Sequence, residues 1–421
     1  MIGLYAIFIR LYGWAIRLAA LKNPKARDWI AGRKGIFKEL DSIRFKVQPF
    51  WIHAASLGEY LQAKPVIERL KATYPSVPIV LTFFSSSGYQ NFKDLHLVDA
   101  VLYLPLDTRY NAQRWVQQIH PRAAFFIKYE FWPNYLDALC HHKVPYGFLA
   151  ASFREDHPIF SWWGGFIKDR VFRASLITVQ DPMSKRRLEQ NGYFNASLSG
   201  DSRFDQVFEQ AQDPKRFPKV EEFVDGHPVL MAGSCWPEDE EVILPQIMRF
   251  TRIKFIFAPH DISDQNIRRL IQSLPVPALR YSEIKDEDDL TEFRVLVIDN
   301  IGMLSHLYAL ATYAHVGGGY KQGLHNILEP AAHGNVVFFG PQIEKYWEAS
   351  EIIRKKAGFP VKDAAEFTGL LKEFESDPTI RESARNAALE FVDSQRGSAD
   401  RMMEAIRQLH LGLGERPTLP E

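Results

Sequence analysis

The sequence has few of the features that mark a disulfide-stapled, metal-binding or nucleic-acid-binding protein. Cys140 and Cys235 are the only cysteines in 421 residues, too few for a disulfide framework and typical of a reducing compartment. No cluster of His, Cys, Asp or Glu has metal-ligand spacing. Basic and acidic residues number 51 each, so the zero net charge does not indicate nucleic-acid binding. What remains is ordinary globular composition, with 46% hydrophobic residues and a length suited to two domains.

The sequence also has no uninterrupted apolar run long enough to cross a membrane. Residues 1–21 are mostly apolar, but Arg10 and Arg17 interrupt them and lie on one face of a helix. Large apolar residues fall on another face: Leu4, Ile7, Phe8, Leu11 and Leu18. This pattern predicts an amphipathic helix in the plane of a membrane interface, with an ordinary core helix as the alternative. A secretory signal is not indicated, because no positive stretch precedes the apolar run.

Positive charge is concentrated near the N-terminus. The first 50 residues contain ten lysines and arginines against three acidic residues. Six of these cations follow the apolar run: Lys22, Lys25, Arg27, Arg33, Lys34 and Lys38. Such a cluster is attracted to anionic lipid at a cytoplasmic membrane face by about 1 kcal/mol per residue. We therefore expect residues 1–40 to form a basic, membrane-associating segment.

From residue 49 the chain alternates between short apolar runs and longer helical or loop segments. In the first half the runs lie at residues 50–53, 79–83, 100–104, 123–127, 146–149, 176–179 and 196–198. In the second half they lie at residues 229–232, 255–258, 295–298, 314–316 and 336–339. The alternation predicts two doubly wound α/β domains with parallel sheets, facing a cleft beyond the carboxyl ends of their strands.

Domain boundaries follow from where the alternation stops and resumes. Residues 206–227 lose the pattern and carry Pro214 and Pro218 among charged residues, which is typical of a linker. We therefore expect an N-terminal domain at 41–205 and a C-terminal domain at 228–395. A closing helix and a tail are expected at 396–421.

The segment from Phe50 to Tyr60 combines a buried strand, a turn of small residues and a helix start. Ser56 and Glu59 have the spacing of a capping box, which would explain both residues by helix initiation alone. The alternative is catalytic. Backbone N–H groups near Ser56 and Gly58 would receive a substrate, and Glu59, kept ionised by the helix N-terminus, would be a general base.

Two further charged residues are predicted to lie near the same cleft. Glu130 follows a strand and so lies at its carboxyl end, although a solvated acid beside Lys128 is the alternative. Arg203 lies where the first domain ends, and a cation there could meet an anionic ligand.

The second domain has two glycine-bearing turns after buried strands. Gly233 and Ser234 precede a helix start rich in acidic residues, where a phosphate could approach backbone amides. Three glycines, Gly317–Gly319, remove side chains where a phosphate or ribose could touch the backbone. Asn326 and Glu329 can cap the next helix, and Glu329 can also accept from ribose hydroxyls. Together these features favour a nucleotide-sugar site.

Taken together, these segments resemble the Kdo transferases, which add 3-deoxy-D-manno-octulosonic acid (Kdo) to a lipid A precursor during lipopolysaccharide assembly. The resemblance extends over nearly the whole chain. It rests on His53–Glu59, Glu130–Asn134, Gly200–Asp205, Gly233-Ser234 with Glu240-Glu241, Pro259-His260, Gly317–Gly319, Asn326–Gly334 and Gly340-Pro341.

The resemblance implies a GT-B glycosyltransferase fold, CMP-Kdo as donor, a membrane-embedded lipid A precursor as acceptor, inversion at the anomeric carbon, and no metal or other cofactor. It implies that Glu59 is the general base and that Glu130 is a second essential acid on the acceptor side, near Ser56 and Gly58. An anionic donor would then be bound by Arg203, Gly233, Ser234, His260, Gly318, Gly319, Lys321, Asn326 and Glu329.

The chain departs from the family pattern around the donor. Ala258-Pro259-His260 stands where the family often has Pro-Arg-His, so one cation is missing, and Lys321 is a candidate replacement. Asp201-Ser202-Arg203-Phe204 stands where the family usually has Asn-Leu-Lys-Phe, and the loop after the glycines also differs. These departures concern individual donor contacts more than the activity.

The expected function is therefore inverting Kdo transfer at the cytoplasmic face of an inner membrane. The expected partners are CMP-Kdo, a lipid A precursor and anionic membrane lipid, with no nucleic acid. Two other functions stay open. One is another GT-B nucleotide-sugar transferase or epimerase, and the other is a catalytically inactive scaffold that binds lipid A.

Overall fold

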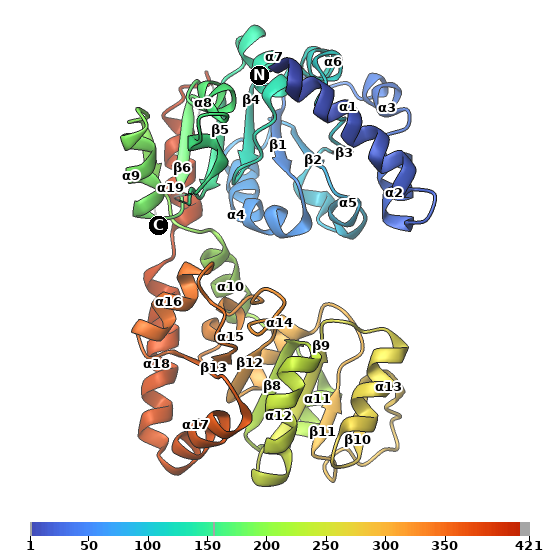
Figure 1. The fold of residues 1–421 in the computed structure, drawn as a ribbon, viewed down its shortest axis with the longest axis vertical. Coiled ribbons are helices and arrows are strands. Elements are labelled where there is room, and N and C mark those ends of the chain that lie inside the picture. Colours follow the sequence, from blue (N-terminus) through green and yellow to red (C-terminus); the bar gives the residue numbers. More distant parts are fainter. Residues whose placement is uncertain (1, 155, 413–421) are drawn as a thin grey trace. The chain divides into compact units, whose positions relative to one another are not determined.

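The computed structural model describes residues 2–154 and 156–412. Within them the chain forms two compact units (Figure 1), one running to Gln206 and resuming at Gly397, the other from Val207 to Arg396. Each unit contains a seven-stranded parallel sheet with helices packed on both faces. The prediction of two doubly wound α/β domains is confirmed.

The first unit is built on a sheet in the order β3-β2-β1-β4-β5-β6-β7. Its strands are β1 (Phe50–Ala54), β2 (Ile79–Phe83), β3 (Ala100–Tyr103), β4 (Ala123–Ile127), β5 (Tyr146–Ala151), β6 (Leu176–Val179) and β7 (Ala196–Leu198). Strand β1 pairs with β2 on one side and β4 on the other, with Phe50 aligned to both Ile79 and Ala123. The strand order therefore reverses between β1 and β4, and their carboxyl ends form the switch point where such folds bind ligands.

Helices cover both faces of this sheet because successive strand residues point to opposite sides. Trp51 and Phe126 pack with α3, α6 and α7, whereas Phe50 and Ile52 pack with α4 and α19. The helices of this unit are α1 (Ile2–Ala19), α2 (Pro24–Ala31), α3 (Ile36–Ser42), α4 (Leu57–Thr73), α5 (Ser86–Asn91), α6 (Arg109–Ile119), α7 (Pro133–His141), α8 (Gly165–Val171), α9 (Pro182–Gln190) and α19 (Ser398–Arg407), with α10 (Arg203–Gln212) continuing into the second unit.

The second unit repeats the plan with the order β10-β11-β9-β8-β12-β13-β14. Its strands are β8 (Val229–Cys235), β9 (Lys254–Pro259), β10 (Ala278–Arg280), β11 (Val295–Val297), β12 (Tyr313–Val316), β13 (Val336–Phe339) and β14 (Gly358–Pro360). Its helices are α11 (Pro218–Val224), α12 (Pro237–Arg249), α13 (Asp264–Ser273), α14 (Leu304–Leu307), α15 (Leu328–Ala332), α16 (Trp347–Arg354), α17 (Ala364–Ser376) and α18 (Pro378–Ser394). Leu230 packs with α12 and α17, and its neighbour Met231 packs with α11 and α14 on the other face. The switch point of this sheet lies between β8 and β12.

Helix α1 has an exposed apolar face. Leu4, Phe8, Leu11 and Leu18 are each more than 60% exposed, whereas Ile9 is only 4% exposed. Among the described residues, α1 is the one helix long and apolar enough to cross a membrane by length and composition. The predicted amphipathic helix is therefore present, and the alternative of a core helix is wrong.

One segment folds differently from the sequence-based expectation. Residues 206–227, expected to be a linker, contain the end of α10 and all of α11, whose Val220 and Phe223 are fully buried in the second unit. The closing helix expected at 396–421 is present as α19, and it packs against α4 in the first unit. The part of the predicted tail beyond residue 412 lies outside the described residues.

Candidate active site

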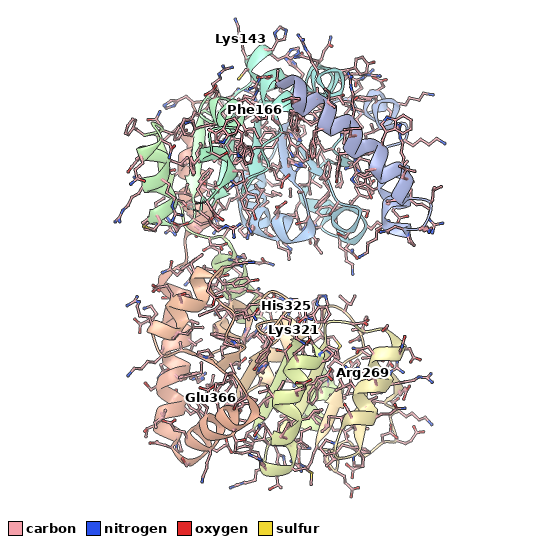
Figure 2. All side chains as sticks on the ribbon, in the orientation of Figure 1. Lys143, Phe166, Arg269, Lys321, His325 and Glu366 are labelled. Carbon is pink, nitrogen blue, oxygen red and sulfur yellow. The ribbon has the colours of Figure 1, made fainter. Side chains whose placement is uncertain are left out.

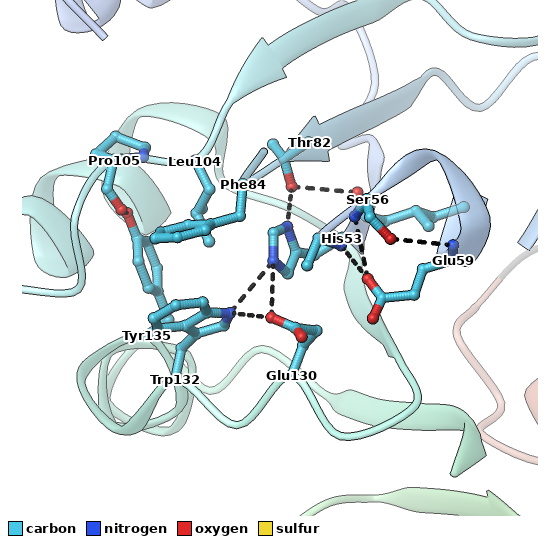
Figure 3. A network of polar contacts seen from close by, with 12 residues as sticks. His53, Ser56, Glu59, Thr82, Phe84, Leu104, Pro105, Glu130, Trp132 and Tyr135 are labelled. Carbon is cyan, nitrogen blue, oxygen red and sulfur yellow. Dashed lines mark hydrogen bonds and ion pairs between the residues drawn. The ribbon is translucent and has the colours of Figure 1, made fainter. Parts of the chain in front are cut away.

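The predicted acceptor-side residues gather at the carboxyl ends of β1 and β4. Ser56, Gly58 and Glu59 come from the loop after β1 and the first turn of α4, and Glu130 comes from the loop after β4. The two strands are paired in register, so their ends meet at one edge of the sheet (Figure 3). The structure therefore brings the two predicted carboxylates together.

Ser56 and Glu59 form the capping box that their spacing predicts. The Glu59 N–H donates to Ser56 Oγ at 3.4 Å, and Glu59 Oε2 accepts from the backbone N–H groups of Ala55 and Ser56. Gly58 is exposed, and a Cβ at this position would meet nothing closer than Ser56 Oγ at 3.9 Å. The capping interpretation is correct. The same hydrogen bonds fix the Glu59 carboxylate against the backbone of the loop between β1 and α4.

The helix N-terminus alone does not set the ionisation of Glu59. Burial is the largest influence and, with the negative charge of Glu130, raises the pKa of Glu59 to about 7. The N–H groups of Ala55 and Ser56 and the cation of Lys128 act in the opposite direction but do not outweigh burial. Near pH 7 this carboxyl is close to half ionised, which suits a group that must accept and then release a proton.

Glu130 is held by Trp132 and lies beside His53, and the sequence analysis assigned neither residue to the site. Trp132 Nε1 donates both to Glu130 Oε2 at 3.1 Å and to His53 Nε2 at 3.2 Å. His53 Nε2 lies 3.7 Å from Glu130 Oε2, and the ring of Phe84 packs on Trp132 with centroids 4.8 Å apart. The alternative that Glu130 is merely a solvated acid is not supported, because its side chain is only 15% exposed.

Two cations, Lys128 and Arg203, lie next to Gln62. With its amide turned to satisfy both of them, Gln62 accepts from Lys128 Nζ at 3.2 Å and from Arg203 Nε at 3.3 Å. Arg203 also pairs with the buried Asp201 at 2.6 Å. Arg203, predicted to bind the donor, thus belongs to the first unit, and its role toward the donor stays a prediction.

In the second unit, three aromatic rings stack at the carboxyl ends of β8, β9 and β12. The centroids of Trp236 and His260 are 4.4 Å apart, and those of His260 and His325 are 4.8 Å apart. Trp236 Nε1 donates to His325 Nε2 at 3.2 Å. His260 was predicted from the sequence. The sequence analysis gave Trp236 and His325 no role.

The glycines of the second unit are required by the crowding of the protein's own backbone. A Cβ on Gly317 would lie 2.3 Å from the carbonyl oxygen of Ser234, and one on Gly319 would lie 2.7 Å from the backbone nitrogen of Gly340. Close packing of strand ends therefore explains these glycines without a ligand. Contacts of Gly233, Ser234, Gly318 and Gly319 with a donor remain predictions.

A buried carboxylate joins the two glycine-bearing turns. Asp239 Oδ2 accepts from the backbone N–H of Trp236 at 2.8 Å and from that of Gly318 at 3.1 Å. Gly318 has a φ of +94°, a conformation that glycine adopts without strain. Asp239 thus fixes the N-terminus of α12 against the glycine turn.

The remaining predicted residues of the second unit are engaged with one another or with nearby carboxylates. Asn326 Nδ2 donates to Glu329 Oε1 at 3.0 Å, and Asn326 Oδ1 accepts from the N–H of Leu328, so the pair caps α15. Burial raises the pKa of Glu329. Lys321, in the same loop as His325 (Figure 2), pairs with Glu238 at 2.8 Å.

The chain is similar to known proteins over most of its length. A family model described as 3-deoxy-D-manno-octulosonic-acid transferase (kdotransferase) matches residues 21–206, the unit that carries Glu59 and Glu130. A Kdo transferase of Rickettsia bellii is 25% identical over 405 residues, covering 93% of this chain and 94% of that protein. One of Haemophilus influenzae is 26% identical over 415 residues, with the same coverage.

The family model and these relatives support the Kdo transferase family for this chain. Another relative, the Kdo transferase of Aquifex aeolicus, is 26% identical over 77% of this chain and 85% of its own length. The Kdo transferase relatives therefore span both units and not only the matched N-terminal one.

Solved structures support the fold of the chain. A UDP-N-acetylglucosamine 2-epimerase superposes with a TM-score of 0.61 at 14% identity, covering 90% of this chain and 99% of that chain. The UDP-GlcNAc 2-epimerase of Neisseria meningitidis gives 0.59 at 12% identity, over 86% of this chain and 100% of that chain. At this level of identity the likeness shows a shared GT-B-like architecture and nothing about substrate.

Proposed function

We propose that the chain transfers Kdo from CMP-Kdo to a hydroxyl of a lipid A precursor, with inversion at the anomeric carbon. The observation that carries the proposal is the carboxylate pair Glu59 and Glu130 at the switch point of the first sheet, in the unit that the family model matches. Full-length relatives named as Kdo transferases support this reaction over that of an epimerase, with which the chain shares only the fold.

Glu59 is the proposed general base. In the transfer step the acceptor oxygen bonds to the anomeric carbon of Kdo, while the bond from that carbon to the phosphate oxygen of CMP breaks and its electron pair leaves with CMP. The proton of the acceptor hydroxyl passes to the Glu59 carboxylate. Glu130, oriented by Trp132, is proposed to bind on the acceptor side.

The second unit is the proposed donor site. CMP-Kdo carries a phosphate and a carboxylate, which need N–H donors or cations. The stacked His260 and His325 and the N-terminus of α12 behind Gly233 and Ser234 supply such groups at one edge of the sheet. We assign charge neutralisation to these groups and not to a metal, so turnover should persist in excess EDTA.

Membrane attachment at the cytoplasmic face of the inner membrane completes the proposal. The exposed face of α1 supplies apolar contact area. A cavity of about 600 Å³ lies among α1, α2, α3 and α6, and its lining mixes apolar and basic side chains. The cations that line it are Arg17, Arg33, Lys34, Lys38 and Arg114. This mixture complements an anionic lipid, with the phosphate at the cations and an acyl chain against the apolar wall.

The transfer reaction itself is the decisive test. Purified protein would be mixed with CMP-Kdo generated in situ and a tetra-acylated lipid A precursor, and the products would be weighed by mass spectrometry. We expect the acceptor mass to rise by one or more Kdo residues. Glu59→Gln should lower kcat about 100-fold or more, the usual contribution of a general base, while CMP-Kdo binding stays near wild type.

Glu68→Gln, about two and a half turns further along α4, is the matched control and should retain activity. Unchanged turnover in Glu59→Gln would remove the base from the proposal. Binding of the lipid A precursor without any transfer by the folded wild type would favour an inactive scaffold, and turnover with a UDP-sugar instead of CMP-Kdo would favour another GT-B enzyme.

A further inference from the structure

A continuous chain of side-chain hydrogen bonds leads from Trp51 to the Glu130 carboxylate, and Figure 3 shows its part from Thr82 through His53 and Trp132 to Glu130. Trp51 Nε1 donates to Thr82 Oγ1 at 2.9 Å, and the same oxygen lies 2.9 Å from His53 Nδ1. The Thr82 hydroxyl also faces the carbonyl oxygen of Ile52 at 3.3 Å. On the far side of the imidazole, Trp132 Nε1 lies 3.2 Å from His53 Nε2.

The two indole groups determine which imidazole nitrogen carries the proton. An indole N–H can only donate, so in its contact with Trp132 Nε1 the Nε2 of His53 is the acceptor and carries no proton. The proton of a neutral His53 is then on Nδ1 and is donated to Thr82 Oγ1. That oxygen accepts from Trp51 as well, so its own proton goes to the carbonyl of Ile52. Every donor in the chain has an acceptor in this single arrangement.

We propose that His53 is a positioning residue of the transfer site. With its proton on Nδ1, it holds the indole N–H of Trp132 with its Nε2 and thereby fixes the Glu130 carboxylate that shares this N–H. His53 itself has 0% exposure, so it acts through Trp132 and Glu130 and does not touch the substrate. The kinetic part of this inference depends on the proposed transferase function, whereas the position of the proton does not.

Thr82 offers a pair of variants that separates this role from simple packing. Thr82→Ser keeps the hydroxyl, whereas Thr82→Val keeps the β-branched shape in β2 but leaves both the Nδ1 proton of His53 and the indole N–H of Trp51 without an acceptor. In Thr82→Val we expect the proton to move to Nε2, where it opposes the Trp132 N–H. The kcat should then fall about tenfold, with KM for CMP-Kdo unchanged, while Thr82→Ser stays within about twofold of wild type.

Nitrogen-15 NMR of histidine-labelled protein measures the proton position directly, with His53 assigned from the spectrum of His53→Gln. We expect a protonated Nδ1 and an unprotonated Nε2 in the wild type and Thr82→Ser, and the reverse in Thr82→Val. A protonated Nε2 in the wild type would overturn the inference. So would Thr82→Val that shows a lowered melting temperature but the kcat of Thr82→Ser, because that pattern describes a structural residue.

A second variant provides a check that loss of packing alone cannot imitate. Trp132→Phe keeps a ring against Phe84 but removes the shared N–H, and it should lower kcat by itself. Because it also removes the donor that opposes the relocated proton, adding Thr82→Val should cost less than in the wild-type background. Strictly multiplicative losses would contradict the coupling. Absence of Kdo transfer in the wild type would count against the proposed function and leave the NMR result to decide the position of the proton.

Discussion

At the scale of single residues, the surroundings of Glu59 set function against stability. The two backbone N–H groups that donate hydrogen bonds to the Glu59 carboxylate favour its charged form. Burial and the charge of Glu130 nevertheless raise its pKa to about 7. In an unfolded chain the pKa of the same group is near its ordinary value of 4.5. Forming the charged base that the proposed reaction needs therefore costs folding free energy, and an uncharged residue of the same shape avoids that cost.

This conflict predicts opposite effects of pH on activity and stability. The kcat/KM for transfer should rise about tenfold per pH unit below about pH 7 and level off above it, as Glu59 ionises. Because the pKa of Glu59 is raised by folding, its stabilising contribution is complete below pH 4.5 and is lost as the pH rises through 7. Scanning calorimetry should therefore show Glu59→Gln gaining stability relative to the wild type between pH 5 and pH 8. An unchanged difference would contradict the raised pKa.

The residues of the site divide into those that sequence reasoning could find and those that it could not. Ser56 and Glu59 were predicted because their interaction is local and has a fixed spacing. His53 and Trp132 meet across 79 positions in the sequence, and only the pairing of β1 with β4 brings them together. No local pattern reveals such a contact, although both residues lie in segments that resemble the family.

At the scale of elements, hydrogen bonds through Asp107 link α1 to α7, the helix that starts beside the site. The Tyr5 hydroxyl donates to Asp107 Oδ2 at 2.7 Å, and Asp107 also accepts from the backbone N–H groups of Asn134 and Tyr135 in the first turn of α7. Asp107 is fully buried. The N-terminal helix is thus part of the folded unit, and the hydrogen bond from Tyr5 to Asp107 holds it there.

The exposed and buried faces of α1 predict different outcomes for similar substitutions. Phe8→Ser with Leu11→Ser removes two side chains that are 62% and 61% exposed, so we expect at least tenfold weaker binding to anionic vesicles with an unchanged melting temperature. The control, Ile9→Ser, changes a residue that is 4% exposed and should lower the melting temperature instead. A vesicle flotation assay measures the first effect. Undiminished binding by the double variant would place the membrane contact elsewhere.

The elements predicted from sequence are those with strong apolar runs. Twelve runs correspond to strands, whereas β10 and β14 were missed. All three residues of β10 are half-buried, and β14 contains Gly358 and Pro360, so neither strand shows a pattern that distinguishes it from a loop.

At the scale of the whole molecule, the chain leaves the first unit through α10 and later returns to complete it. Asp205 in α10 accepts from the backbone N–H groups of Gly397 and Ala399, and so fixes the start of α19. Arg69 of α4 binds both carboxylate oxygens of Asp400. The apolar spacing of residues 398–410 predicted a helix, but it could not tell which sheet that helix covers, because both domains offered a similar apolar face.

The return of α19 predicts that a C-terminal substitution destabilises the N-terminal unit. Met402 is 1% exposed and packs in the core formed with α4 and β1, so Met402→Ala should cost about 2–5 kcal/mol. Hydrogen–deuterium exchange should then accelerate in β1, β4 and α4 while the strands of the second unit keep their protection. Phe374→Ala in α17, also 1% exposed, is the mirror control and should accelerate exchange in β8 and β13 instead. If Met402→Ala loosened β8 and β13 as much as β1, the closing helix would not belong to the first unit alone, and the division of the chain at Arg396 would have to be redrawn.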